Sequence, residues 1–228
     1  MKQLSFIKSL ALILSVFLFS FNPAIGQEKG EPLIVNKSDS SNYLVFHITG
    51  DGGWHSFDIK MANEFKSHHL SYVYLNSLKY FWKTKTPDEL AIDIIPVLRE
   101  YLEKWNKKEL ILSGFSFGAE IIPFLYTRLP EDLKQKVKMV IAITPASTSD
   151  FTIHVSDMMG VDHKYIYDVP KEVEKIKTTK VVVIFGEKEK STFPESMKQE
   201  NLKIEFIKGG HHFTDAKSVM EEYIAELK

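Results

Sequence analysis

Short apolar runs alternate with longer amphipathic segments from residue 43 to the end of the chain. The runs are rich in β-branched and aromatic residues, which favours strands. In the segments between them, apolar residues recur every three or four positions, as in helices that bury one face. The pattern predicts strands at 43–48, 71–75, 109–113, 137–143, 181–185 and 204–207, and helices at 57–68, 87–105, 117–129 and 215–227.

Strands separated by helix-length segments indicate a mostly parallel sheet of the α/β class. The runs are almost continuously apolar, which is typical of strands covered on both faces. We therefore expect about six or more strands with helices on both faces, in a single domain spanning residues 43–228. Functional groups in such sheets gather at the carboxyl ends of the strands.

The first 26 residues have the features of a secretory signal peptide. Lys2 and Lys8 precede or border an apolar stretch at 9–21, and Ala24-Ile25-Gly26 provides small residues for cleavage. The stretch is too short to span a bilayer comfortably, although an uncleaved anchor is the alternative. We expect an exported protein, periplasmic or secreted, that begins near Gln27. A flexible lead-in is predicted at 27–42, and no transmembrane segment is predicted in the mature chain.

The composition of the chain disfavours several classes of function. Loss of Lys2 and Lys8 leaves 27 basic and 30 acidic residues, a net charge of −3, which is not typical of nucleic-acid binding. The chain has no cysteine, which excludes a cysteine nucleophile, thiolate metal ligands and disulfides.

A candidate nucleophile lies between the third predicted strand and the helix that follows it. The stretch Gly114-Phe115-Ser116-Phe117-Gly118 has the form of a nucleophile elbow, a sharp strand–turn–helix with a central serine. Glycines two before and two after that serine let the strand and helix approach closely. The alternative is a helix-entry turn in which Ser116 only caps the helix.

The remaining members of a catalytic triad follow in the order serine, acid, histidine that α/β-hydrolases use. After the fifth predicted strand come Glu187 and Glu189, of which we favour Glu189, three residues past Gly186. After the sixth come His211 and His212, of which we favour His211, directly after two glycines. Both glutamates as solvated loop charges, and Asp150 as the acid, are weaker alternatives. A metal site is disfavoured, because no further ligand has helical spacing to the histidine pair.

An oxyanion hole requires backbone N–H groups near the nucleophile. By position, Phe117 and Asp51 supply them, the latter from the loop Thr49-Gly50-Asp51-Gly52-Gly53. The Asp51 carboxylate either braces this loop or binds a cationic part of the substrate. Trp54 either walls the pocket or packs in the core.

Two further segments are candidates for substrate contact. The segment Lys79–Lys85 mixes three lysines with Tyr80, Phe81 and Trp82, a composition suited to anionic lipid headgroups; a packed loop with solvated lysines is the alternative. Residues Phe151–Met159 form an apolar insertion after the fourth predicted strand, where either a pocket wall or an edge strand is expected.

Together these residues resemble the bacterial VirJ-type virulence proteins, a branch of the α/β-hydrolases. The resemblance implies an exported protein of α/β-hydrolase fold. The related AcvB type is linked to hydrolysis of aminoacylated phosphatidylglycerol, which implies cleavage of an ester between an amino acid, notably lysine, and a lipid headgroup. Members often carry cysteines around the acid loop, whereas this chain has none, so Glu187 and Glu189 both remain open. The matching blocks are Thr49–Trp54, Ser77–Trp82, Thr86-Pro87, Gly114–Glu120, Leu129-Pro130 and Gly209–Phe213.

The sequence therefore predicts an exported serine esterase without a cofactor, acting on an ester substrate at or near an anionic membrane surface. By charge, Glu120 or Asp51 is the candidate partner for a lysyl ammonium. A general carboxylesterase or peptidase, and a non-catalytic binding module of the same fold, are the alternative functions. The sequence gives no indication of the oligomeric state.

Overall fold

The computed structural model describes residues 32–154, 165–211, 213 and 216–227. The predicted signal peptide, the first residues of the predicted lead-in and His212 lie outside the described residues.

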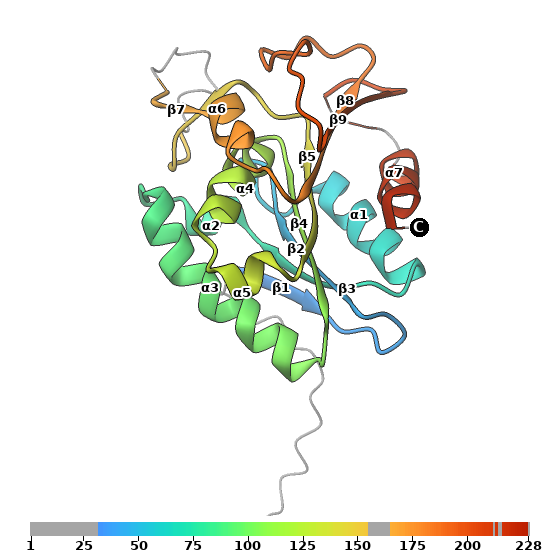
Figure 1. Ribbon diagram of the computed structural model, residues 1–228. Coiled ribbons are helices and arrows are strands. Elements are labelled where there is room, and N and C mark those ends of the chain that lie inside the picture. The colour runs from blue at the N-terminus through green and yellow to red at the C-terminus, as the bar shows by residue number, and fades with distance from the viewer. Residues whose placement is uncertain (1–31, 155–164, 212, 214–215, 228) are drawn as a thin grey trace, which may run out of the picture.

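A seven-stranded sheet forms the centre of the fold (Figure 1). Its strand order is β1-β3-β2-β4-β5-β8-β9, and every neighbouring pair is parallel except the edge pair β1–β3. All six predicted strands are present, with boundaries within two residues. The strands are β1 (Leu33–Asn36), β2 (Tyr43–Ile48), β3 (Ser71–Leu75), β4 (Glu109–Phe115), β5 (Val137–Ile143), β8 (Lys180–Gly186) and β9 (Leu202–Ile207).

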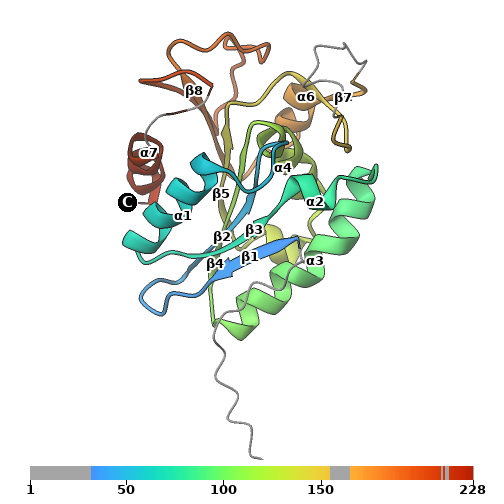
Figure 2. The same cartoon turned by 180° about the vertical axis from the view of Figure 1, so that it is seen from behind.

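Helices cover both faces of this sheet (Figures 1 and 2). One face carries α1 (Ser56–Ser67) and α7 (Lys217–Leu227), which contact each other. The other carries α3 (Pro87–Lys104), α4 (Phe117–Arg128) and α6 (Val169–Glu174). Two short helices, α2 (Ser77–Tyr80) and α5 (Glu131–Lys134), complete this layer.

The apolar strands supply two separate cores, one for each face. Successive side chains of a strand point to opposite faces, so Val45 packs with α1 and α7, whereas Phe46 packs with α3 and α4. The same alternation divides Ile111 from Leu112 in the next strand. Burial on both sides explains why the strands read as continuous apolar runs.

A row of hydrogen-bonded polar side chains lies on the α1/α7 side of the sheet. His47 of β2 lies opposite Ser113 of β4, and its Nδ1 is 3.0 Å from the Ser113 hydroxyl. The same hydroxyl bonds that of Tyr223, and all three side chains are fully buried. Buried hydroxyl groups require hydrogen-bond partners. These bonds therefore hold α7 against β2 and β4.

Helix α3 begins as the sequence predicts. The hydroxyl of Thr86 accepts a bond from the Glu89 N–H, and the Glu89 carboxylate accepts one from the Thr86 N–H, with Pro87 in the first turn.

The predicted flexible lead-in is wrong for Leu33–Asn36, which form β1. This strand pairs antiparallel with β3, and the Asn76 N–H donates to the Pro32 carbonyl at 2.7 Å. A run of three apolar residues gives little periodicity, and its partner is supplied by the exposed edge of the sheet.

The sequence pattern also misses a two-stranded antiparallel ribbon and α6, which lie between β5 and β8. The ribbon consists of β6 (Thr148–Ser149) and β7 (Tyr167–Asp168), which are too short to show a period. Within the described part of the predicted insertion, residues 151–154 form no strand, and Phe151 is buried against Phe81 and Phe124.

The turn between β4 and α4 forces Ser116 into a backbone conformation that side chains rarely adopt. Its φ is 51° and its ψ is −119°. A methyl group on Gly114 would lie 2.2 Å from the Gly118 carbonyl oxygen, and one on Gly118 would lie 2.1 Å from that of Ile48. The strand–helix approach predicted for the nucleophile elbow is therefore present, and β2 takes part in it.

We expect Gly118→Ala to lower the free energy of unfolding by about 3 kcal/mol or more, because the clashing atoms belong to backbone. Chemical denaturation measures the change. Gly210→Ala is the matched control, since a methyl there meets nothing within 4 Å. Its effect should stay within about 0.5 kcal/mol. Equal stability of the two variants would contradict the close approach.

Candidate active site

Three loops at the carboxyl ends of β4, β8 and β9 bring Ser116, Glu189 and His211 together. The Ser116 Oγ lies 2.9 Å from Nε2 of His211, and Nδ1 of His211 lies 2.6 Å from Oε1 of Glu189. In the neutral ring, the Ser116 hydroxyl donates to Nε2, while the Nδ1–H donates to the carboxylate. The arrangement is that of a nucleophile, a base and an orienting acid.

The acid loop distinguishes Glu189 from Glu187. The Glu189 N–H donates to the Gly186 carbonyl at 2.9 Å, which turns its side chain back toward the sheet edge, where it is only 7% exposed. The Gly186 N–H approaches the other carboxylate oxygen at 3.4 Å. The side chain of Glu187, in contrast, is exposed to solvent.

The acid and base loops contact each other through backbone. A methyl on Gly186 would lie 2.7 Å from the Gly210 carbonyl oxygen, so only glycine fits at this crossing. The Lys188 N–H donates to the Gly209 carbonyl at 3.0 Å. These contacts set the position of His211 relative to Glu189.

The charges around His211 favour its protonated form. The hydrogen bond to Glu189 raises the pKa of the imidazole above its usual value, and partial burial opposes this. Asp51 and Glu120 add smaller upward contributions. A base of raised pKa retains the proton that it removes from a serine.

The predicted oxyanion residues flank Ser116. Phe117 is the first residue of α4, where a backbone N–H has no acceptor within the helix. The loop of Asp51 passes close to the nucleophile, since a methyl on Gly50 would lie 3.6 Å from Cβ of Ser116. The Asp51 carboxylate accepts from the Gly52 N–H at 2.8 Å, which is the bracing role.

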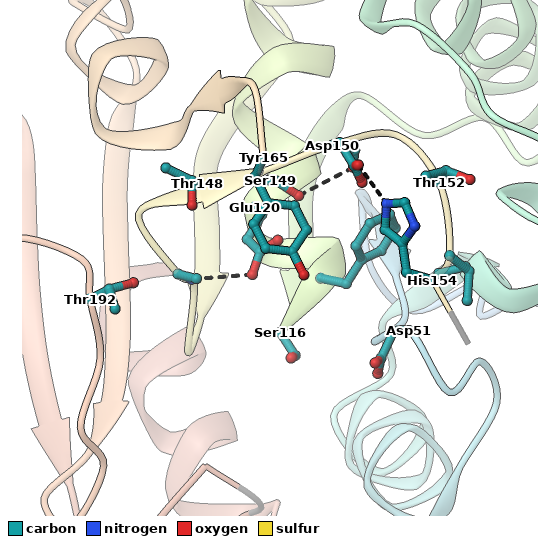
Figure 3. A pocket seen from close by; sticks show the side chains of 13 residues that line it. Asp51, Ser116, Glu120, Thr148, Ser149, Asp150, Thr152, His154, Tyr165 and Thr192 are labelled. Atoms are coloured by element: carbon teal, nitrogen blue, oxygen red, sulfur yellow. Dashed lines mark hydrogen bonds and ion pairs between the residues drawn. The ribbon is translucent and has the colours of Figure 1, made fainter. Parts of the chain in front are cut away.

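A cavity of about 370 Å³ opens beside Ser116 (Figure 3). Asp51, Glu120 and Asp150 give it three carboxylates, and Asp150 is paired with His154 at 2.6 Å. Asp150 is therefore a cavity residue rather than the triad acid. The insertion after β5 does line the cavity, through Thr152, Ile153 and His154. The remaining lining residues are Phe117, Ala146, Thr148, Ser149, Tyr165 and Thr192.

Sequence reasoning missed part of this wall. Thr148, Ser149, Tyr165 and Thr192 belong to the ribbon, its flank and the acid-loop connection, and no local motif marks them. Their position after β5 and β8, at the carboxyl edge of the sheet, was the one available signal.

Glu120 lies in the first turn of α4 and faces the cavity (Figure 3). Its Oε1 accepts from the Ala146 N–H at 3.3 Å, and the Ser149 hydroxyl, which donates to the Asp150 carbonyl, lies near its carboxylate. Burial raises the pKa of this carboxyl to about 7.

The three aromatic residues predicted to bind substrate do not line this cavity. Trp54 packs edge-on against Tyr74, with ring centroids 4.9 Å apart, so the packing alternative is correct. The Tyr80 hydroxyl donates to Asp93 at 2.7 Å, and its ring lies under the Lys85 ammonium. The Trp82 side chain is 65% exposed.

The segment that carries Trp82 is nevertheless joined to the cavity wall. The Lys85 N–H donates to the Phe151 carbonyl at 2.7 Å, and the Ile153 N–H donates to that of Phe81 at 3.1 Å. Trp82 therefore lies on a loop bonded to residues adjoining and lining the cavity.

Neither a membrane-spanning helix nor a metal-binding group is found in the described part of the chain. No helix there is sufficiently long and apolar to cross a bilayer. No three His, Asp or Glu side chains there are grouped in a way that would hold a metal ion.

Comparison with known proteins places the chain in a family. A family model described as "Bacterial virulence protein (VirJ)" matches residues 42–228, and no curated protein matches. Est1E from Butyrivibrio proteoclasticus is 12% identical with a TM-score of 0.59, over 86% of this chain and 90% of that one. The α/β hydrolase GrgF from Penicillium sp. sh18 is 13% identical with a TM-score of 0.62, over 86% and 97%. The Pyrococcus furiosus esterase Pf2001 is 12% identical with a TM-score of 0.59, over 86% and 89%.

At these identities the solved structures establish the α/β-hydrolase fold, and the family model covers the whole described sheet except β1. The chain belongs to the VirJ family of bacterial virulence proteins.

Proposed function

We propose that this protein is a serine esterase. The observation that carries the proposal is the hydrogen-bonded chain Ser116–His211–Glu189 beside a cavity. The strained conformation of Ser116 supports it, because such strain persists where it presents a nucleophile. Structural neighbours that are named as esterases agree with this chemistry.

The geometry supports a two-step reaction. The Ser116 Oγ attacks the ester carbonyl carbon as His211 Nε2 takes the hydroxyl proton, and N–H groups of Phe117 and Asp51 hold the oxyanion. Collapse breaks the bond to the alcohol oxygen, which receives the proton from Nε2. Water then attacks the acyl-serine, giving up a proton to His211, which passes it to the Ser116 Oγ as the acyl bond breaks and the acid is released. Glu189 orients the ring throughout, and no cofactor takes part.

We further propose that the substrate is the aminoacyl ester of aminoacyl-phosphatidylglycerol, notably the lysyl form. The cavity supports this choice because its carboxylates suit an ammonium group. Membership in the VirJ family supports it through the function that the sequence resemblance implies. The predicted signal peptide would place the mature protein in the periplasm or outside the cell.

A lipid substrate requires the protein to approach a membrane surface, and the loop of Trp82 suits that approach. Trp82 and Lys83 are exposed, and the loop is bonded to the cavity wall. An exposed indole inserts between headgroups, while lysines attract anionic lipid.

A fluorophosphonate probe should label the protein, and Ser116→Ala should abolish labelling. The same variant should lose hydrolysis of lysyl-phosphatidylglycerol and of short acyl esters. Mass spectrometry and product release give the two readouts. Absence of labelling and of hydrolysis across this panel would support a non-catalytic binding module. A preference for short acyl esters over the aminoacyl lipid would instead indicate a general carboxylesterase.

Glu189→Gln should lower kcat/KM about 100-fold or more, because the ring loses its orientation and the support of its charged form. It should also shift the acidic limb of the pH–rate profile to lower pH, since Glu189 is the largest cause of the raised His211 pKa. The matched control is the exposed Glu187→Gln, which should change neither. A larger loss in Glu187→Gln would reverse the assignment of the acid.

Trp82→Ser should weaken binding to phosphatidylglycerol vesicles about tenfold, because it removes the exposed indole. Co-sedimentation at low salt measures binding, with phosphatidylcholine vesicles for comparison. Phe206→Ser is the control, since Phe206 is another exposed aromatic residue, on edge strand β9. Unchanged binding in Trp82→Ser would exclude this loop as the membrane contact.

A further inference from the structure

One partly buried acid beside the nucleophile has no part in the triad. Glu120 is one helical turn beyond Ser116, and its N–H donates to the Ser116 carbonyl at 3.2 Å. Both side chains line the same cavity (Figure 3). Removing a carboxyl from water costs stability. An acid that is kept in a cleft beside a nucleophile despite this cost is a candidate for a role in binding the substrate.

The partners of Glu120 leave its charge uncompensated. Its carboxylate accepts from the Ala146 N–H, and the Ser149 hydroxyl lies near it, both of them neutral groups. Among the ion pairs of the described residues, none involves Glu120. Of the charged groups that act on its pKa, Asp51 raises it, and His211, which lowers it, is already bonded to Glu189.

The other two carboxylates of the cavity differ in this respect. Asp150 is paired with His154, and the exposed Asp51 braces its own loop through Gly52. Glu120 is thus the cavity carboxylate whose hydrogen bond comes from a neutral donor on another segment, the Ala146 N–H.

The chemistry of an aminoacyl ester restricts where its ammonium lies. The α-nitrogen is separated from the reacting carbonyl carbon by a single carbon atom, so it stays close to Ser116 Oγ in the acyl-enzyme. Glu120 is in the first turn of α4, which begins directly after Ser116, and both side chains line the same cavity. The Glu120 carboxylate is therefore placed to meet that nitrogen.

We propose that Glu120 is the specificity-determining residue for the acyl half of the substrate, and that its carboxylate binds the α-ammonium of an aminoacyl ester. This inference rests on the proposed esterase function and extends it. It selects Glu120 over Asp51 as the acid that recognises the amino group, and it assigns the aminoacyl half to the carboxylate-lined cavity. The alcohol half then leaves from the His211 side, where the returning proton is delivered.

The competing explanation is that Glu120 only braces the loop at Ala146. Glu120→Gln separates the two, because the amide oxygen still accepts from the Ala146 N–H while the charge is lost. Glu120→Asp keeps the charge on a shorter side chain.

The test compares two esters that share a glycerol leaving group, alanyl-glycerol with a free ammonium and N-acetylalanyl-glycerol without one. Glycerol release gives kcat/KM for each at pH 7. Glu120→Gln should lower kcat/KM for the alanyl ester about 10- to 100-fold, the effect of a lost charged hydrogen bond. The N-acetylalanyl ester should change less than about threefold. Glu120→Asp should recover part of the preference, and Glu187→Gln should leave the ratio of the two rates unchanged.

The inference about Glu120 and the proposed esterase function would be contradicted by different results. Equal losses for both esters in Glu120→Gln would show a bracing role and overturn the inference, while the esterase function would stand. No preference for the alanyl ester in the wild-type protein would overturn it as well. Failure of the wild-type protein to hydrolyse either ester, together with no fluorophosphonate labelling, would remove the proposed function itself.

Discussion

The close approach of β2, β4 and α4 is the constraint on which the rest of the site depends. Gly118 lies against the Ile48 carbonyl and Gly114 against that of Gly118, so no side chain separates the helix from the two strands. Ser116 lies in this tight turn, at the carboxyl end of β4, with a positive φ. The loop after β2 is thereby drawn to within contact of the nucleophile, which is where an oxyanion donor is required.

The sequence predicts the six long strands and four main helices because the apolar residues within each segment show which of its faces are buried. Strands covered on both faces are apolar throughout, and α3 carries its own start signal at Thr86. Strand β1 and the ribbon β6–β7 escape such reasoning, since they are short and exist only through their pairing partners. The preference for Glu189 over Glu187 has a local basis, the turn in which the Glu189 N–H bonds the Gly186 carbonyl, whereas the contact of Gly186 with Gly210 is nonlocal.

Trp54 and Tyr80 show that an aromatic residue near a candidate site in sequence need not line the cavity. Trp54 follows the oxyanion loop closely in sequence, yet its ring packs against Tyr74 in the α1/α7 core. Tyr80 is likewise engaged with Asp93 and Lys85 on α3 and its preceding loop. Proximity along the chain did not place either ring in the cavity, whereas Glu120, which was named by charge alone, lines it beside Ser116.

The bond between the Lys188 N–H and the Gly209 carbonyl, with the contact of Gly186 and Gly210, makes one body of the acid and base loops. Ser116 is held in a different part of the sheet, between β4 and α4. We therefore expect the distance between Ser116 and His211 to vary more than the distance between His211 and Glu189. The Glu189 carboxylate would then keep the proton of the His211 ring on Nδ1 even when the serine hydroxyl lies beyond hydrogen-bond distance.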